Sequence, residues 1–214
     1  GLMLERVRFG ATDEAAFSRA AAQVQQQFDA SIDALGRISA QVAADRDTIR
    51  SARPNSPASA RLFEAVDRTL PRAPIRRTGV TVYDASGAPV AWAGRVSDLS
   101  QERLDGPAPL FVMPTPRGPL LVWIEPVPDR DRRPSTRIAT IVVEQALGPD
   151  QPPSDAGDQL IVSTSLVPVT LRVRGVGTPQ PQTPFTFVVL SRSGEPLVDA
   201  AVSQTDLAAA RARW

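Results

Sequence analysis

Apolar residues in the first third of the chain recur with the period of an α-helix. Between residues 12 and 50 no proline occurs, and the single interior glycine is Gly36. The apolar seam consists of Phe17, Ala21, Val24, Phe28, Leu35, Ile38, Val42 and Ile49, with Ile32 beside its first gap. This spacing predicts one long helix over residues 12–50, which Thr12 would cap at its N-terminus.

Such a helix would extend over roughly 55 to 60 Å at 1.5 Å per residue, which is more than the core of one small domain requires. Two interpretations of its seam remain open, because it can pack on this chain's own second helix and sheet or form a parallel homodimer. After a break between Pro54 and Pro57, an amphipathic pattern predicts a second helix over residues 58–70. Residues 1–78 are therefore expected to form a helical region that packs on a sheet.

From Gly79 onward the apolar period becomes that of β-strands. Strand-like residues flank the segment Asp84-Ala85-Ser86-Gly87, which predicts a hairpin whose glycine adopts a positive φ. A short helix is expected near residues 97–104, and three further strands are expected at 110–113, 120–127 and 137–147. Residues 79–147 are thus expected to form a β domain of five strands with one short helical insertion.

The rest of the chain predicts a second β module. Residues 148–158 are rich in Pro, Asp and Gly and lack periodicity, which indicates a linker. Residues 159–214 resume the strand pattern and end in a helix that Ser203 or Thr205 would cap. The motif Ser-Gly-x-Pro occurs at 86–89 and again at 193–196, which indicates either two related modules or one turn chemistry used twice.

The complete pattern predicts an α+β fold. A long N-terminal helix packs on a PAS-like antiparallel β-sheet, and a smaller β module follows at the C-terminus.

Composition removes most catalytic chemistry. The chain contains no histidine and no cysteine, and all of its 24 basic residues are arginine. These absences exclude Ser-His-Asp and Cys-His relays, Schiff-base lysines, the P-loop lysine and His- or Cys-ligated metals. Paired carboxylates remain as an option, but Glu125 and Asp129, the nearest such pair, are separated by Pro126 and Pro128. We therefore expect a non-catalytic domain without a metal site or a cofactor.

Charge and hydropathy limit the partners. The net charge is +1, with basic and acidic residues well mixed, so we expect no nucleic-acid partner. The densest basic segment, residues 68–77, is expected to be a solvated helix end and loop. No run of about 18 apolar residues occurs, and the first nine residues lack the apolar core of a signal peptide. The sequence as given is expected to be soluble, as a segment between two membrane-spanning helices would be.

The order of elements resembles that of a known family. A long helix and a shorter helix precede a strand of the form Val-x-Val-Tyr-Asp-x-x-Gly-x-Pro-Val, at Val80–Val90; a short helical crossover and three strands follow. This order resembles extracytoplasmic PAS-like sensor domains, called Cache or PDC domains, over about residues 12–147. The second hairpin resembles part of the smaller membrane-proximal module of double-Cache receptors.

The resemblance implies a function as well as a fold. It implies a periplasmic or extracellular signal-sensing domain of a bacterial transmembrane receptor, most often a sensor histidine kinase. It also implies flanking transmembrane helices outside this sequence, a homodimer formed partly through the long helix, and a small-molecule ligand over the sheet. The arginine-aromatic motif by which some of these domains bind amino acids is not apparent here, so the resemblance names no ligand.

A ligand pocket over the sheet would draw on polar and aromatic residues that follow the first hairpin. The candidates are Tyr83, Trp92, Arg95, Trp123, Glu125 and Arg137. The aromatic candidates would equally suit the core of a sheet, and the charged candidates would equally suit its solvent-exposed face. The alternative function is a secreted or envelope module that binds a protein partner and has no small-molecule site.

Overall fold

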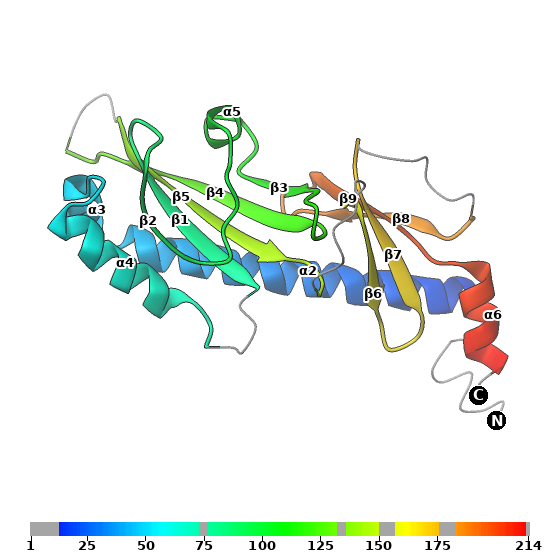
Figure 1. Cartoon of the computed structure of the whole chain (residues 1–214). Helices are drawn as coiled ribbons and strands as arrows, with labels where there is room; N and C mark the ends of the chain where they lie inside the picture. The colour runs from blue at the N-terminus through cyan, green and yellow to red at the C-terminus, as the bar shows by residue number, and fades with distance from the viewer. Residues whose placement is uncertain (1–12, 73–76, 132–135, 150–156, 176–182, 213–214) are drawn as a thin grey trace. The chain divides into compact units, whose positions relative to one another are not determined.

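The computed structural model describes residues 13–72, 77–131, 136–149, 157–175 and 183–212 (Figure 1). Its contacts form two compact units. We call them the central unit (Ile32–Phe111 and Leu121–Ala146) and the C-terminal unit (Gly1–Ser31, Val112–Leu120 and Leu147–Trp214). One sheet has five strands and the other has four. Together with the long N-terminal helix, they confirm the predicted α+β fold class.

The region predicted as one helix over residues 12–50 contains two helices. Helix α2 (Asp13–Ala43) ends before Asp45, which is not helical and whose side chain accepts a hydrogen bond from the Thr48 N–H, 3.3 Å away. A new helix, α3 (Arg46–Ser51), begins at that cap. The prediction of one uninterrupted helix was therefore wrong, because Asp45 caps a new helix instead of extending the first. Thr12 lies outside the described residues.

The second predicted helix is present as α4 (Pro57–Thr69). The side chain of Ser56 caps it by accepting a hydrogen bond from the Ser59 N–H at 3.1 Å, and a proline occupies its first turn. The Ser59 hydroxyl in turn donates to the Val90 carbonyl oxygen of β2. None of the described helices combines the length and apolarity that a membrane crossing requires.

The apolar seam of α2 is buried within this chain. Ala16, Ala20, Val24 and Phe28 are buried in the C-terminal unit, and Ile32, Leu35, Ile38 and Val42 are buried in the central unit. Gln26, Gln27, Arg37 and Gln41 lie exposed on the other side of the helix. This packing supports the intramolecular interpretation of the seam. The homodimer through this helix stays a prediction, and it would have to use the polar side.

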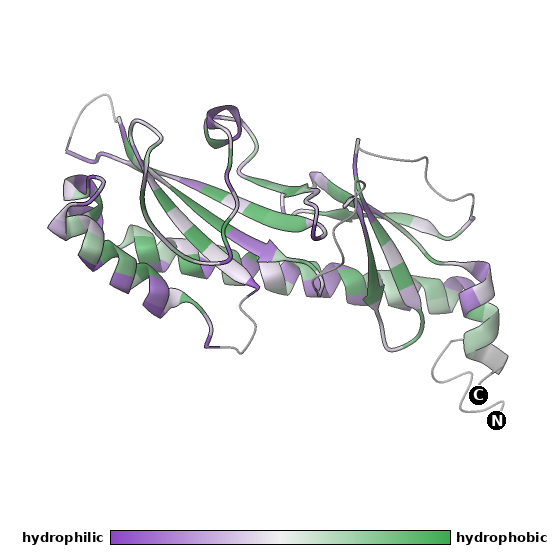
Figure 2. Ribbon diagram, in the orientation of Figure 1, coloured by the Kyte–Doolittle hydropathy of each residue, from purple (hydrophilic) through white to green (hydrophobic). Residues whose placement is uncertain are grey.

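The sheet of the central unit places its strands in the order β2-β1-β5-β4-β3. The strands are β1 (Thr78–Asp84), β2 (Pro89–Gly94), β3 (Leu110–Met113), β4 (Leu120–Pro128) and β5 (Arg137–Ala146). Apolar residues follow the central strands (Figure 2), and Val82, Leu121 and Ile141 are fully buried. The second half of α2 lies along one face, while the short helix α5 (Gln101–Leu104) and the connection that carries it lie on the opposite face (Figure 1).

Alanine at Gly36 of α2 is expected to raise the free energy of unfolding by about 0.5 to 1 kcal/mol, because glycine is unfavourable inside a helix. The added Cβ would lie 3.6 Å from the Trp123 ring, an ordinary van der Waals distance. Urea denaturation would measure the gain. Ala40→Gly, at an exposed position of the same helix, is the matched control and should lose a similar amount. A destabilised Gly36→Ala protein would show that Trp123 cannot accommodate the methyl group.

The C-terminal unit has a sheet in the order β6-β7-β9-β8. Its elements are β6 (Gln159–Ser163), β7 (Pro168–Val173), β8 (Thr186–Leu190), β9 (Pro196–Ala201) and helix α6 (Gln204–Ala212). The first half of α2 packs here through Phe17, whose ring centroid lies 5.4 Å from that of Phe185 and 5.7 Å from that of Phe187. The Gln25 amide donates to Leu190 O at 2.8 Å and accepts from Leu190 N at 3.1 Å. The side chain thereby continues the hydrogen bonding of the edge strand β8.

The repeated Ser-Gly-x-Pro motif forms the same turn in both sheets. Gly87 and Gly194 have φ angles of 84° and 85°. Equivalent backbone bonds close the turns, from Gly87 N to Asp84 O and from Gly194 N to Ser191 O, each 3.0 Å long. The first strand of the hairpin is interior in the five-stranded sheet, whereas the second is interior in the four-stranded sheet. The different placement favours one turn chemistry used twice over two related modules.

Candidate functional site

A pocket of about 380 Å³ opens on the face of the five-stranded sheet that the β2–α5 connection crosses. We call it the sheet pocket. Its walls come from β1, from the following turn and β2, and from the connection: Thr81, Tyr83, Gly87, Pro89, Trp92, Val96, Ser97, Asp98 and Leu99. Its volume is within the usual range for small-molecule sites.

The strand register explains which side chains face the sheet pocket. Thr81 lies directly opposite Trp92 in the antiparallel pair β1–β2. Because side chains alternate along a strand, Thr81 and Tyr83 share the pocket face, whereas Val80 and Val82 point to the other face and are fully buried. Trp92 is 46% exposed, yet the ring of Phe63 from α4 contacts it with 4.6 Å between centroids and 71° between planes. The tryptophan is therefore an exposed aromatic surface with a fixed support.

A buried carboxylate holds the connection that forms one wall. Glu144 on β5 is only 1% exposed, and it accepts hydrogen bonds from the Ser97 N–H at 2.8 Å and from the Ser97 hydroxyl. Its register partner on β1 is Gly79, where an added Cβ would overlap with the Arg95 carbonyl group at the start of the same connection. Burial raises the pKa of Glu144, while the bonds from Ser97 and the charge of Arg95 act in the opposite direction. Glu144 thus fixes the wall at Ser97.

Tyr83 is the single tyrosine of the chain and is buried beside the same wall. Burial raises its pKa, and the negative charges of Glu144 and Asp98 raise it further. The Leu99 backbone acts on the pKa in the opposite direction. The connection is therefore attached to the sheet by the hydrogen bonds from Ser97 to Glu144, and Leu99 lies near the Tyr83 hydroxyl.

One polar atom of the pocket lacks a partner. Thr81 is 4% exposed, and its Oγ1 has no hydrogen-bond partner of normal geometry among the described residues; Tyr83 interacts with it only weakly. An unsatisfied buried hydroxyl costs about 1 to 3 kcal/mol, so folded proteins rarely keep one without a reason. The oxygen has almost no accessible surface, so a ligand in the pocket would reach it only after a local shift of the wall.

Thr81→Val is therefore expected to raise the free energy of unfolding by about 1 kcal/mol, because valine keeps the shape and removes the unsatisfied hydroxyl. Equilibrium unfolding in urea would detect the change. Thr69→Val is the matched control in the same unit, since the Thr69 hydroxyl donates to Val66 O at 2.7 Å, and this variant should lose about 1 kcal/mol. An equal loss in both variants would mean that Thr81 is already satisfied.

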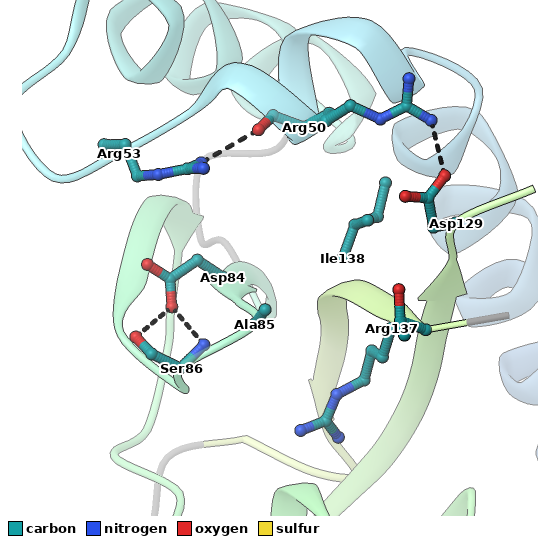
Figure 3. Close-up of a pocket in the computed structure, with 9 residues that line it drawn as sticks. Arg50, Arg53, Asp84, Ala85, Ser86, Asp129, Arg137 and Ile138 are labelled. Carbon is teal, nitrogen blue, oxygen red and sulfur yellow. Dashed lines mark hydrogen bonds and ion pairs between the residues drawn. The ribbon is translucent and has the colours of Figure 1, made fainter. Parts of the chain in front are cut away.

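A second pocket, of about 560 Å³, lies where α3, the β1–β2 turn and the start of β5 meet (Figure 3). Its charged residues form pairs. Arg50 contacts Asp129 at 2.9 Å and Asp131 at 2.7 Å, and Arg137 contacts Asp105 at 2.6 Å. Arg53 donates to Arg50 O at 2.9 Å. We call this the charged pocket; its arginine side chains already have protein partners.

Asp84, at the rim of the charged pocket, serves the turn. Its Oδ1 accepts from Ser86 N at 2.9 Å, from Ser86 Oγ at 2.6 Å and from Ala88 N at 3.1 Å. Burial acts to raise the pKa of Asp84, but these hydrogen bonds outweigh burial and hold the pKa below its ordinary value. This confirms the sequence-based interpretation of Asp84 as a turn residue.

The structure does not bring the six residues predicted from the sequence together in one site. Tyr83 and Trp92 line the sheet pocket, and Arg95 lies close enough to Glu144 to affect its pKa without lining that pocket. Arg137 lines the charged pocket.

Trp123 and Glu125 lie on the side of the sheet that contacts α2. The Trp123 Nε1–H donates to Glu125 Oε2 at 3.1 Å, and the ring packs over Gly36. The Ser39 hydroxyl of α2 lies 3.5 Å from the same carboxylate. These two residues therefore connect the sheet to the helix, and the sheet pocket is built without them.

The sequence analysis missed the polar residues Thr81, Ser97, Asp98 and Glu144. Glu144 carried a signal, because it follows the apolar run Ile141-Val142-Val143 and a charge within such a strand has to be paired when it is buried. Thr81 and Tyr83 are two residues apart on one predicted strand, so the alternation of side chains also predicts that both lie on the same face of the sheet. Ser97 and Asp98 lie in a connection without periodicity, and only the tertiary structure locates them.

Within the described ranges, no group of three or more carboxylates is placed to hold a metal ion. Comparison with models of protein families gives no match. Searches of curated proteins and of solved structures also give no significant match.

Proposed function

We propose that this chain is the periplasmic sensing domain of a bacterial transmembrane receptor of the sensor histidine kinase type, and that it binds a small molecule in the sheet pocket. The observation that carries the proposal is the unpartnered Thr81 hydroxyl in the wall of a 380 Å³ pocket. A site that retains an unsatisfied polar group gives up stability, as binding sites commonly do.

The architecture of the central unit supports the proposal. The strand order β2-β1-β5-β4-β3, with a long helix on one face and a connection over the other, is the arrangement of PAS-like domains. The sequence-based expectation started from that resemblance, and the sheet pocket occupies the face on which such domains bind ligands.

Contacts within the central unit offer a route for a signal. A ligand that moves the β2–α5 connection would change its attachment to β5 at Glu144. On the opposite face, the contacts of β4 with α2 through Trp123 and Ser39 would transmit a shift of the sheet to the helix. A ligand with different affinities for two such positions would shift the balance between them.

The test is a thermal-denaturation screen of the purified chain with neutral, cationic and anionic small molecules. A specific ligand should stabilise the protein by about 2.7 kcal/mol at a hundred times its dissociation constant. The stabilisation should fall in Trp92→Ala, and Arg117→Ala, an exposed position outside the pocket, is the control. Stabilisation that survives Trp92→Ala would place the ligand elsewhere. The proposal also predicts that the full gene encodes membrane spans on both sides of this segment.

One observation favours the alternative, a module that binds a protein partner. Ile161 on β6 and Val188 on β8 are 66% and 39% exposed, and the register places both on the same face of the four-stranded sheet. Exposed apolar side chains on one face can mark an interaction surface. The screen separates the two functions, because a protein-binding module predicts no small-molecule stabilisation that depends on Trp92.

A further inference from the structure

The charged residue that lines the sheet pocket is acidic. The chain has 24 basic residues, but no arginine is among the described residues that line this pocket, whereas Asp98 contributes a carboxylate to its wall. Glu144 lies behind the wall at Ser97. Arg95, the basic residue whose charge reaches Glu144, does not line the pocket. The charged pocket, by contrast, has three arginines in its wall.

The aromatic residues of the sheet pocket complement this negative charge. The Trp92 ring is about half exposed and is supported from α4 by Phe63, and Tyr83 lies on the same face. The faces of tryptophan and tyrosine rings attract cations, and tryptophan does so most strongly. A supported indole and an aspartate that line the same pocket suit an alkylammonium group.

We propose that the sheet pocket binds a small organic cation, an ammonium compound whose charged group lies against Trp92 and Asp98. This inference rests on the proposed function and specifies its ligand class. The Thr81 hydroxyl, which is buried and has no partner among the described residues, would bind a polar substituent of the same molecule once a local shift of the pocket wall uncovers it. A quaternary or primary ammonium that carries a hydroxyl group meets both requirements.

The electrostatics of the buried groups agree with this ligand class. The negative charges of Glu144 and Asp98 add to the effect of burial in raising the pKa of Tyr83, which indicates a negative potential at its hydroxyl. A bound cation would reduce that potential. An anionic ligand would increase it and would have to approach Asp98 without a basic partner from the described lining.

Three probes of nearly equal shape test the inference: choline, its neutral isostere 3,3-dimethylbutan-1-ol and the anion 3,3-dimethylbutanoate. The readout is the indole N–H signal of Trp92 in NMR spectra of the purified chain, assigned with Trp92→Phe. Choline should bind about tenfold more tightly than the neutral isostere, since a partly desolvated cation gains about that factor over an aromatic ring. The anion should bind most weakly.

Two carboxylate variants identify the partner of the cation. Asp98→Asn should weaken choline binding about three- to fivefold, as expected for a partly exposed ion pair, and should leave the neutral isostere unchanged. Asp47→Asn, at an exposed carboxylate on α3 outside the pocket, should change neither. Both positions are exposed, so both variants should fold. Equal weakening by the two substitutions would indicate a general charge effect and would overturn the role of Asp98.

The outcomes separate this inference from the proposed function. If the neutral or the anionic probe moves the Trp92 signal at least as strongly as choline does, the cation inference fails, while a small-molecule site remains. If none of the three probes moves it at roughly 10 mM, where a millimolar ligand would saturate, the inference fails and the proposed function loses its pocket. A shift of Trp123 as large as that of Trp92 would also count against the site.

Discussion

Replacing Gly94 with alanine is expected to lower the free energy of unfolding by about 3 kcal/mol. Gly94 ends β2 with a φ of 76°, a conformation that costs other residues about 1 to 2 kcal/mol. An added Cβ would also overlap with the Thr78 carbonyl oxygen of the neighbouring strand. That oxygen accepts a hydrogen bond from Arg95 N at 3.3 Å, so it cannot move away freely, and overpacking of this kind typically costs about 1 to 3 kcal/mol more.

Equilibrium unfolding in urea would measure this loss, and Gly194→Ala separates its two causes. Gly194 has a φ of 85°, but no described atom lies within 4 Å of the position that its Cβ would occupy. Its substitution should therefore lower the free energy of unfolding only by the cost of the positive φ, about 1 to 2 kcal/mol. Equal losses at Gly94 and Gly194 would show that crowding against β1 contributes nothing. Because Gly94 follows Trp92 by two residues, Gly94→Ala should also disturb the sheet pocket.

Periodicity predicted the type and order of the main elements. The 3.6-residue seam identified buried residues of α2 such as Val24 and Leu35, but near the N-terminus of the helix Ala16 and Ala20 are buried instead of the predicted Ala21. The turn at Gly87 has the positive φ that its hairpin requires. The break after Ala43 was missed because the apolar spacing continues to Ile49, while the hydrogen bond from Thr48 N to Asp45 decides where a helix begins. Local capping outweighed the longer pattern there.

Periodicity could not predict which segments of the chain pack against the buried face of each helix or strand. A seam shows which side of a helix is buried, but not what covers it. The first half of α2 packs on strands whose residues lie far along the chain, as the contacts from Gln25 to Leu190 and from Gln23 to Ser165 show. Likewise, alternation assigns Trp123 and Glu125 to one face of β4, but it does not say that α2 lies against that face. Tertiary contacts supply that information.

Replacing Glu144 with glutamine is expected to remove a decline in stability that the wild-type protein shows as pH rises above the ordinary pKa of a glutamate. Burial raises the pKa of Glu144 in the native state, so the native protein binds this proton more tightly than the unfolded chain does. Stability from this group is therefore fully present below the ordinary glutamate pKa and is lost as pH rises through the raised native value. Glutamine does not titrate, and its carbonyl oxygen can still accept the bond from Ser97 N.

Urea denaturation at several pH values would measure the two profiles, which should diverge as pH rises, with Glu144→Gln the more stable protein at the alkaline end. Asp84→Asn is the control of opposite sign: hydrogen bonds lower the pKa of Asp84, so its contribution is lost only as pH falls below about 4. Absorbance of the single tyrosinate gives an independent check. The pKa of Tyr83 should fall in Glu144→Gln, because one of the charges that raise it is gone.

Parallel stability profiles with an unchanged Tyr83 titration would mean that Glu144 is not buried as a titrating group. The attachment of the pocket wall at Ser97 would then need another explanation.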